Sequence, residues 1–155
     1  IRARLTGRGG AILAWSLTLS LFAWSATQNY NLVFNQYADQ FRGGAWNSSE
    51  MGAVMKEFGQ TYGETDTVWV VPFPYWVDTR LVGVGAGYGP RDFALARENI
   101  AETLDLPSPK LYFAKDEDEE TLSILEHLYP QGALSRYTSA VPGQDFWMFF
   151  VPAGK

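Results

Sequence analysis

Four residues with the chemistry to hold a polar ligand follow one another closely in the middle of the chain: Tyr75, Trp76, Asp78 and Arg80. Aromatic rings stack on the faces of sugars, and a carboxylate or a guanidinium hydrogen-bonds hydroxyl or phosphate groups. These side chains are therefore the candidate ligand-binding residues. The simpler interpretation, which we favour from the sequence, has Trp76 in the core and Asp78 and Arg80 in a local ion pair.

The segment that leads into these residues explains their position. Val68–Val71 has the β-branched and aromatic composition of a buried strand. Pro72 and Pro74 end it, because a proline has no N–H to donate to a sheet. The four residues then lie just beyond the carboxyl end of a strand, where open α/β sheets bind their ligands.

A helix that opens at 77–81 would put Trp76 and Arg80 on one face, because they are four residues apart. Asp78 would then cap the helix or pair with a distant base. In the structural alternative, Trp76 is buried and Arg80 bonds to backbone carbonyls.

Composition limits the classes of function. The 155 residues are 46% hydrophobic and 15% aromatic, which suits one ordinary domain with a real core. Because cysteine is absent and His127 is the single histidine, we expect no metal site, no cofactor and no serine–histidine triad. From Gly9 onward, 9 basic and 17 acidic residues leave a net charge of −8, which argues against nucleic-acid binding.

The N-terminal part has the pattern of a membrane anchor. Arg2, Arg4 and Arg8 precede the apolar run Gly9–Ala26. The arginines predict a membrane helix with the basic side in the cytoplasm and the acidic body outside. Two alternatives are a signal peptide and a strand, since Trp15–Leu21 alternates strictly between apolar and polar residues.

The chain after the anchor reads as helices and strands in alternation. Gln28–Phe41 predicts a helix with one aromatic face, formed by Tyr30, Phe34, Tyr37 and Phe41, which is more typical of a core than of a ligand site. Asn47 with Glu50 predicts a helix cap. The expected buried stripe of the helix that follows is Met51, Val54, Met55, Phe58 and Tyr62.

Four strands are expected in one sheet: Thr67–Val71, Lys110–Ala114, Ala133–Tyr137 and Phe146–Val151. The first two should be parallel and the last two antiparallel. Gly83–Gly89 reads as a flexible turn beside the site, because its spacing does not fit a nucleotide-binding loop. Asp92–Leu104 has a helical pattern that begins with a run able to form a short strand, and Leu122, Ile124, Leu125 and Leu128 predict the buried side of a last helix.

These elements predict an α/β fold. We expect a single layered domain with a mixed, mainly parallel sheet, Rossmann- or flavodoxin-like, preceded by an N-terminal transmembrane or long apolar helix. The expected division is a membrane-anchor segment at residues 1–27 and an extracytoplasmic α/β domain at residues 28–155.

Several segments together resemble a known family: Asn29–Tyr37, Trp76–Arg80, Leu128–Gly132, and Phe146 with Phe150–Pro152. They are similar to the C-terminal extracytoplasmic tail of a bacterial membrane glycosyltransferase of the family 39, protein-mannosyltransferase-like group. The likeness covers nearly the whole chain, from the last membrane helix to the end. It implies sugar transfer from a polyprenyl-phosphate donor at the outer face of the cell membrane.

The resemblance assigns no catalytic residue to this chain. The catalytic acid of that family lies in an early extracytoplasmic loop, which no stretch here matches. The expected role is an accessory or acceptor-facing domain, inactive alone, whose partners are the rest of the membrane-embedded transferase, the membrane, and a glycan or polyprenyl-phosphate sugar. The alternative is a membrane-anchored α/β module that binds a protein or glycan and belongs to no enzyme.

Overall fold

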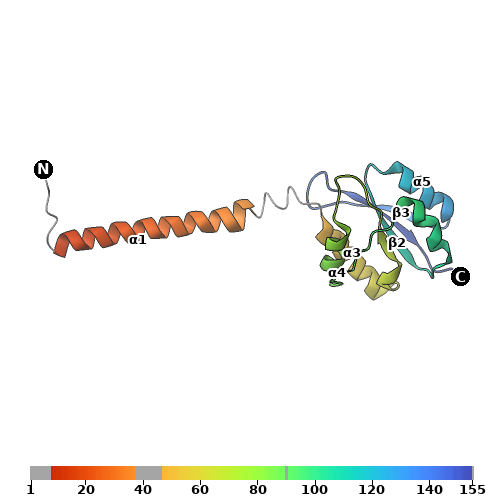
Figure 1. Cartoon of the computed structure of the whole chain (residues 1–155), viewed down its shortest axis with the longest axis horizontal. Coiled ribbons are helices and arrows are strands. Elements are labelled where there is room, and N and C mark those ends of the chain that lie inside the picture. Colours follow the sequence, from red (N-terminus) through yellow and green to blue (C-terminus); the bar gives the residue numbers. More distant parts are fainter. Residues whose placement is uncertain (1–7, 38–46, 90, 155) are drawn as a thin grey trace. The chain divides into compact units, whose positions relative to one another are not determined.

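The computed structural model describes residues 8–37, 47–89 and 91–154. The chain divides into two compact units, Ile1–Gly44 and Ala45–Lys155. The first holds one long helix and the second holds the mixed sheet with its helices, so the expected α/β class with a preceding apolar helix is confirmed (Figure 1).

The described part of the first unit is helical throughout. The α-helix α1 spans Arg8–Tyr30 and continues as the π-helix η1, Asn31–Gln36. The strand alternative for Trp15–Leu21 is therefore wrong. Thr18 and Thr27 each donate a hydroxyl hydrogen bond to the carbonyl four residues earlier, at 2.9 Å, as hydroxyl side chains do inside membrane helices.

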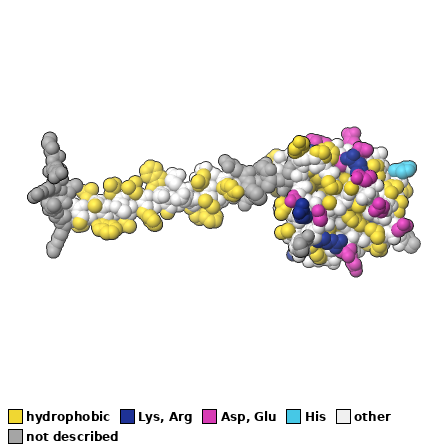
Figure 2. Space-filling view, viewed as in Figure 1, with side chains coloured by type: hydrophobic (Ala, Val, Ile, Leu, Met, Phe, Trp, Pro, Cys, Tyr) yellow, Lys and Arg dark blue, Asp and Glu magenta, His cyan; other side chains and the backbone are white. Residues whose placement is uncertain are grey.

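This helix is long and apolar enough to cross a membrane. The segment Gly9–Gln36 has 28 residues and no charged side chain. At 1.5 Å per residue it is about 42 Å long, which exceeds the hydrocarbon core of about 30 Å. Figure 2 shows apolar side chains along both visible edges of this helix.

The aromatic residues at the end of this helix are not core residues. Tyr30, Phe34 and Tyr37 are all exposed, so the expectation of a buried aromatic face is wrong for them. Phe41 lies outside the described residues. The rings of Tyr30 and Phe34 are 4.8 Å apart and contact each other along the helix. Residues 28–37 therefore continue the apolar helix and do not open the α/β domain.

The second unit is built on one four-stranded sheet. Its strands are β1 (Val68–Val70), β2 (Lys110–Lys115), β3 (Ala133–Tyr137) and β4 (Phe146–Val151), in the order β1-β2-β4-β3. The parallel pairing of β1 with β2 and the antiparallel pairing of β3 with β4 are confirmed. The sheet is mixed, but its parallel share is smaller than expected, because β4 inserts beside β2 and pairs with it antiparallel.

Helices cover both faces of the sheet (Figure 1). The helices α3 (Ser48–Thr61) and α4 (Thr79–Ala86) pack on one face. The other face carries the 3-10 helix η3 (Arg97–Asp105) and α5 (Glu119–Leu128). A short 3-10 turn, η2 (Thr65–Thr67), precedes β1. Alternate residues of β2 point to opposite faces of the sheet. Leu111 and Phe113 pack in the core under α3 and α4, and Tyr112 packs in the core under η3 and α5.

The stripe expected on α3 is mostly confirmed. Met51, Met55 and Phe58 are buried, and Val54 packs against them. Tyr62 is exposed, contrary to expectation, because it lies at the C-cap, one residue beyond the helix.

The glycine-rich segment is a helix rather than a flexible turn. Gly83 and Gly85 lie within α4, and the helix ends at Gly87, whose φ of 90° is the left-handed cap that glycine favours. A Cβ on Gly52 of α3 would lie 2.7 Å from the carbonyl carbon of Gly85. Gly52 and Gly85 therefore allow the close approach of the two helix backbones, whereas a Cβ on Gly83 would meet the ring of Phe93. The spacing of the glycines within the segment does not reveal these contacts.

Asn47 stands at the N-cap of α3 as predicted, but its side chain makes no capping bond. Its Nδ2 donates instead to the carbonyl of Gln144 at 2.6 Å and to Oε2 of Glu50 at 3.1 Å. Glu50 also accepts from the Ser139 hydroxyl at 2.7 Å and from the Ala140 amide at 2.9 Å. This carboxylate ties the start of α3 to the loop between β3 and β4.

We expect Glu50→Gln to remove an acid-sensitive part of the stability. Burial raises the pKa of Glu50, but hydrogen bonds from Ser139, Ala140 and Asn47 outweigh it and lower the pKa below its ordinary value of 4.5. The stabilising contribution is therefore present above the unfolded-state pKa and is lost as the pH falls through the lower folded-state value. Urea unfolding at pH 7 should show a loss of about 1–2 kcal/mol for the variant. A gap between variant and wild type that does not shrink on acidification to pH 3 would contradict this account.

Candidate functional site

The predicted site residues lie in the loop from β1 into α4. The helix begins at Thr79, two residues later than expected, and Asp78 is its N-cap. The Asp78 carboxylate accepts a hydrogen bond from the amide of Arg80 at 3.0 Å. The predicted capping role of Asp78 is therefore confirmed.

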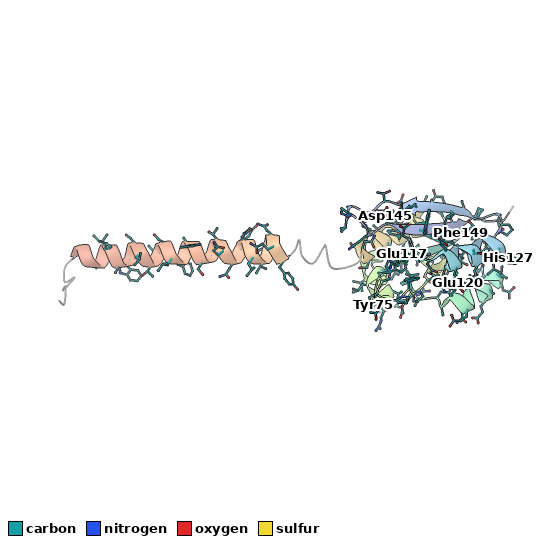
Figure 3. All side chains as sticks on the ribbon, turned by 90° about the horizontal axis from the view of Figure 1, so that it is seen from above. Tyr75, Glu117, Glu120, His127, Asp145 and Phe149 are labelled. Atoms are coloured by element: carbon teal, nitrogen blue, oxygen red, sulfur yellow. The ribbon has the colours of Figure 1, made fainter. Side chains whose placement is uncertain are left out.

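The two aromatic residues of this loop have opposite environments. Trp76 is only 9% exposed and packs in the core with Val70 and Val82, so it does not share an exposed helix face with Arg80. Tyr75 is 96% exposed, and its φ of 56° lies in the left-handed region, which is costly for a residue with a side chain. Figure 3 shows Tyr75 at the edge of the domain. The exposed ring of the site is thus Tyr75, not Trp76.

A second acidic residue joins the site from a different segment. Oδ1 of Asp92 accepts from the Thr79 hydroxyl at 2.6 Å and from the Ala94 amide at 3.0 Å. The segment around it runs beside β1, since Val70 donates to the carbonyl of Phe93 and forms an isolated parallel bridge with Ala94.

Sequence reasoning missed Asp92 as a site residue. The sequence signal for its position is the short-strand pattern at the start of Asp92–Leu104, where the structure has an isolated bridge to β1 but no strand. A segment there, parallel to β1, places its first residue beside the start of α4. The remaining part of that stretch is the helix η3.

Arg80 lies between the two carboxylates. Its Nε is 3.9 Å from Oδ1 of Asp78 and 3.8 Å from Oδ2 of Asp92, and its side chain is 70% exposed. The burial of Trp76 and the ion pair of Asp78 with Arg80 confirm the interpretation that the sequence favoured. The expected bonds from Arg80 to backbone carbonyls are not found among the described residues. Exposed ion pairs of this length contribute about 0–1 kcal/mol, so we expect little of the stability of the domain to depend on Arg80.

The charge balance of this cluster favours a neutral ligand. Asp78 and Asp92 set two carboxylates against one guanidinium, which leaves one net negative charge. The Thr79 hydrogen bond, with help from the Ala94 amide and the Arg80 charge, lowers the pKa of Asp92 despite some burial, so Asp92 is ionised at neutral pH. A phosphate would meet this negative charge, whereas sugar hydroxyls can both donate to the carboxylates and accept from Arg80.

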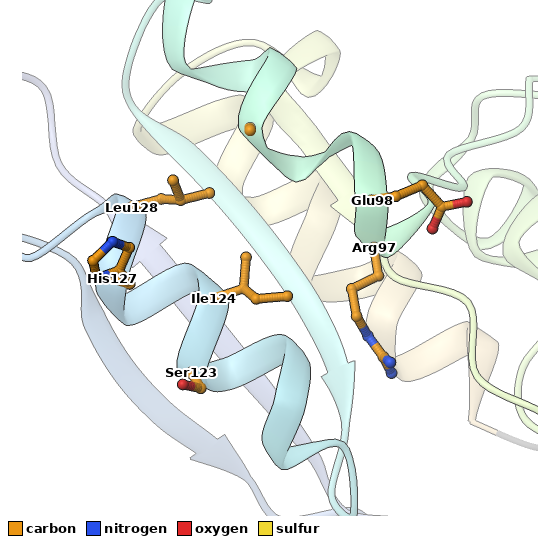
Figure 4. A pocket seen from close by; sticks show the side chains of 7 residues that line it. Arg97, Glu98, Ser123, Ile124, His127 and Leu128 are labelled. Carbon is orange, nitrogen blue, oxygen red and sulfur yellow. The ribbon is translucent and has the colours of Figure 1, made fainter.

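A cavity of about 400 Å³ lies on the other face of the sheet, between η3 and α5 (Figure 4). His127 lines it, far from Tyr75 in Figure 3. Arg97 at its border is already engaged, because it pairs with Asp118 at 2.6 Å and with Glu120. The other lining residues are Glu98, Ala101, Ser123, Ile124 and Leu128. The floor is apolar, and the cavity lacks a convergent set of polar groups.

A second hollow, of about 300 Å³, lies where α3 leaves part of the sheet uncovered. Its lining includes Phe58, Tyr62, Met148 and Phe150, with Glu57 and Ser135 as the polar members. It is an apolar groove and does not contain the predicted site residues.

The core around Tyr112 holds a buried polar network. The Thr103 hydroxyl lies 2.7 Å from the hydroxyls of both Tyr112 and Tyr129, and the buried Lys110 ammonium is 3.4 Å from the Tyr129 hydroxyl. Burial raises the pKa of Tyr112, which therefore stays protonated. The hydroxyls satisfy one another, and the network is inside the protein, so we assign it to stability.

No group of three or more His, Cys, Asp or Glu side chains able to hold a metal ion occurs within residues 8–37, 47–89 and 91–154. Comparison of the chain with protein-family models, with curated proteins and with solved structures gives no match.

Proposed function

We propose that this chain is an extracytoplasmic domain of a membrane glycosyltransferase of the family 39, protein-mannosyltransferase-like group, and that it contacts the sugar or its acceptor without catalysing transfer. The resemblance of the four segments quoted above supports the assignment to that group. An apolar helix that could anchor the chain, followed by an α/β domain, has the organisation such a tail requires.

The observation that carries the ligand role is the arrangement at the start of α4. Tyr75 is exposed in a strained backbone conformation, and strain of this kind collects at functional sites. Arg80 follows five residues later, paired with Asp78 and Asp92 yet exposed to solvent. An exposed ring together with fixed hydrogen-bonding groups is what recognition of a neutral sugar needs.

The proposed orientation puts the acidic body outside the cell. Arg2, Arg4 and Arg8 precede the apolar helix, and the K/R bias of the flanks sets the orientation of a membrane helix. Under this proposal the α4 site faces the compartment in which polyprenyl-linked sugars are used.

Titration of the isotope-labelled chain in micelles with methyl mannoside tests the ligand role. We expect the amide signals of Tyr75, Arg80 and Ala94 to shift, and inorganic phosphate to leave them unchanged because of the negative charge of the cluster. The variant Tyr75→Gly, which relieves the backbone strain while removing the ring, should abolish the shifts without unfolding the domain.

Two outcomes speak against this proposal. Shifts gathered instead at Ser123 and His127 would move the site to the cavity between η3 and α5. Shifts caused by phosphate and not by the sugar would favour a module that binds an anionic partner.

A further inference from the structure

The solvent-facing side of α4 is an apolar surface on an otherwise acidic domain. Leu81 and Val84 lie three residues apart on the helix and are 51% and 56% exposed, and Tyr88, which follows the C-cap Gly87, is 43% exposed. We name these three residues the α4 face. Soluble domains seldom expose helical stripes of this kind without a partner.

The charge around the α4 face differs from that of the domain as a whole. From Thr79 to Gly89 the single charged residue is Arg80, which is basic. The chain from Asn47 onward carries 8 basic and 16 acidic residues. The acidic side chains nearest to this segment, Asp78 and Asp92, lie beside Arg80 at the start of α4. The stretch from Leu81 to Gly89 has no charge of either sign, which suits a surface that enters the apolar boundary of a bilayer.

The α4 face also lies close to the point where the chain enters the domain. Gly85 packs against the first turn of α3: a Cβ on it would lie 3.3 Å from the carbonyl oxygen of Ser48 and 3.4 Å from Cα of Ser49. Asn47 directly precedes this turn. The edge of α4 is therefore beside the residue through which the domain is attached to the preceding chain.

The attachment is short. Ten residue steps separate Tyr37 from Asn47, and a fully extended chain covers at most about 36 Å in ten steps. If Gly9–Gln36 spans the membrane, its end lies at the bilayer surface, so Asn47 stays within that reach of the lipid headgroups. An apolar surface next to Asn47 can then reach the headgroups without leaving this range.

From these observations we infer that the α4 face is a lipid-contacting surface, on which the domain rests against the headgroup region of its own membrane. Leucine and valine enter the apolar boundary of that region, and tyrosine is one of the residues enriched there. Contact of α4 with the membrane would also hold Tyr75 and Arg80, at the start of the same helix, near a polyprenyl-linked substrate. The inference requires the membrane anchor and does not depend on sugar transfer.

The absence of cysteine from the chain makes a direct test simple. The single variants Val84→Cys and Ser123→Cys, the second on exposed α5, carry an environment-sensitive nitrobenzoxadiazole label in the full chain. The chain is reconstituted into vesicles of phosphatidylethanolamine and phosphatidylglycerol. We expect the label at position 84 to emit at shorter wavelength and to be quenched several-fold more by doxyl-labelled lipid than the label at position 123.

Additional variants keep the result decisive. Tyr88→Cys should behave like Val84→Cys. Adding Leu81→Glu to the Val84→Cys chain should lower the quenching by lipid to the level at position 123. Circular dichroism shows whether each variant is folded. Equal lipid quenching at positions 84 and 123 in folded chains overturns the inference. Protection of position 84 from aqueous quenchers without any quenching by lipid also overturns it, because that result would indicate a protein partner.

Discussion

Replacing Gly52 by valine should destabilise the domain by about 3 kcal/mol. A Cβ at this position would lie 2.7–2.8 Å from three backbone atoms of Gly85 and Ala86. Backbone atoms of a packed helix cannot move aside as a flexible side chain can, so α3 and α4 would have to separate. Their separation opens the core that Met51 and Met55 share with Val82. Denaturant unfolding of the purified chain in micelles measures the loss.

Ala53→Val is the matched control for this substitution. It adds a β-branched side chain to the neighbouring position of the same helix, which is exposed. Valine is a poorer helix former than alanine but a better one than glycine, so helix propensity disfavours only the control variant. No clash arises at position 53, and we expect a loss of about 0.5 kcal/mol. Equal stability losses for the two variants would mean that the close approach of α3 and α4 is not what requires glycine.

The second large effect is expected for Asp118→Ala, at about 3 kcal/mol. The side chain of Asp118 is only 1% exposed and caps α5. It accepts from the Thr121 amide at 3.2 Å, from the Thr121 hydroxyl at 2.6 Å and from Arg97 at 2.6 Å. Alanine leaves the start of α5 without a cap and Arg97 without its buried partner.

Glu120→Gln separates this explanation from a general effect of charge. Glu120 pairs with the same arginine, but its side chain is 71% exposed. We expect this variant to change the unfolding free energy by less than about 0.5 kcal/mol. If urea unfolding shows similar losses of unfolding free energy for the two variants, then burial of Asp118 is not the reason for its large contribution to stability.

The elements that could be predicted from the sequence are those with strong local patterns. Phe146–Val151 and Ala133–Tyr137 are observed with the expected bounds, because their apolar and aromatic residues lie between clear turn signals. The parallel pairing of β1 with β2 follows from the helix-containing connection between them. The position of β4 between β2 and β3 depends on long-range packing, which local patterns do not encode.

The candidate site was predictable in location but not in detail. Pro72 and Pro74 correctly marked the point where the chain leaves the sheet and the cap of α4 follows. The different burial of Tyr75 and Trp76 depends on the left-handed φ of Tyr75, which turns the following indole into the core. Asp92 reaches the site because the chain forms a bridge to β1 at Ala94, 16 residues after Asp78, and the need for glycine at Gly85 comes from α3. Both are tertiary effects.

The most direct test of the account is sugar transfer by the complete gene product that carries Arg80→Met. Arg136→Met is the matched control: Arg136 is also an exposed arginine paired with two carboxylates, Asp116 and Asp145, at a different place on the domain. Losing a charged hydrogen bond to the sugar corresponds to about 1.5–3 kcal/mol, or roughly a 10- to 100-fold fall in transfer rate. The account predicts this fall for Arg80→Met with the unfolding transition kept, and wild-type transfer for Arg136→Met. Unchanged transfer by a folded Arg80→Met protein would contradict it.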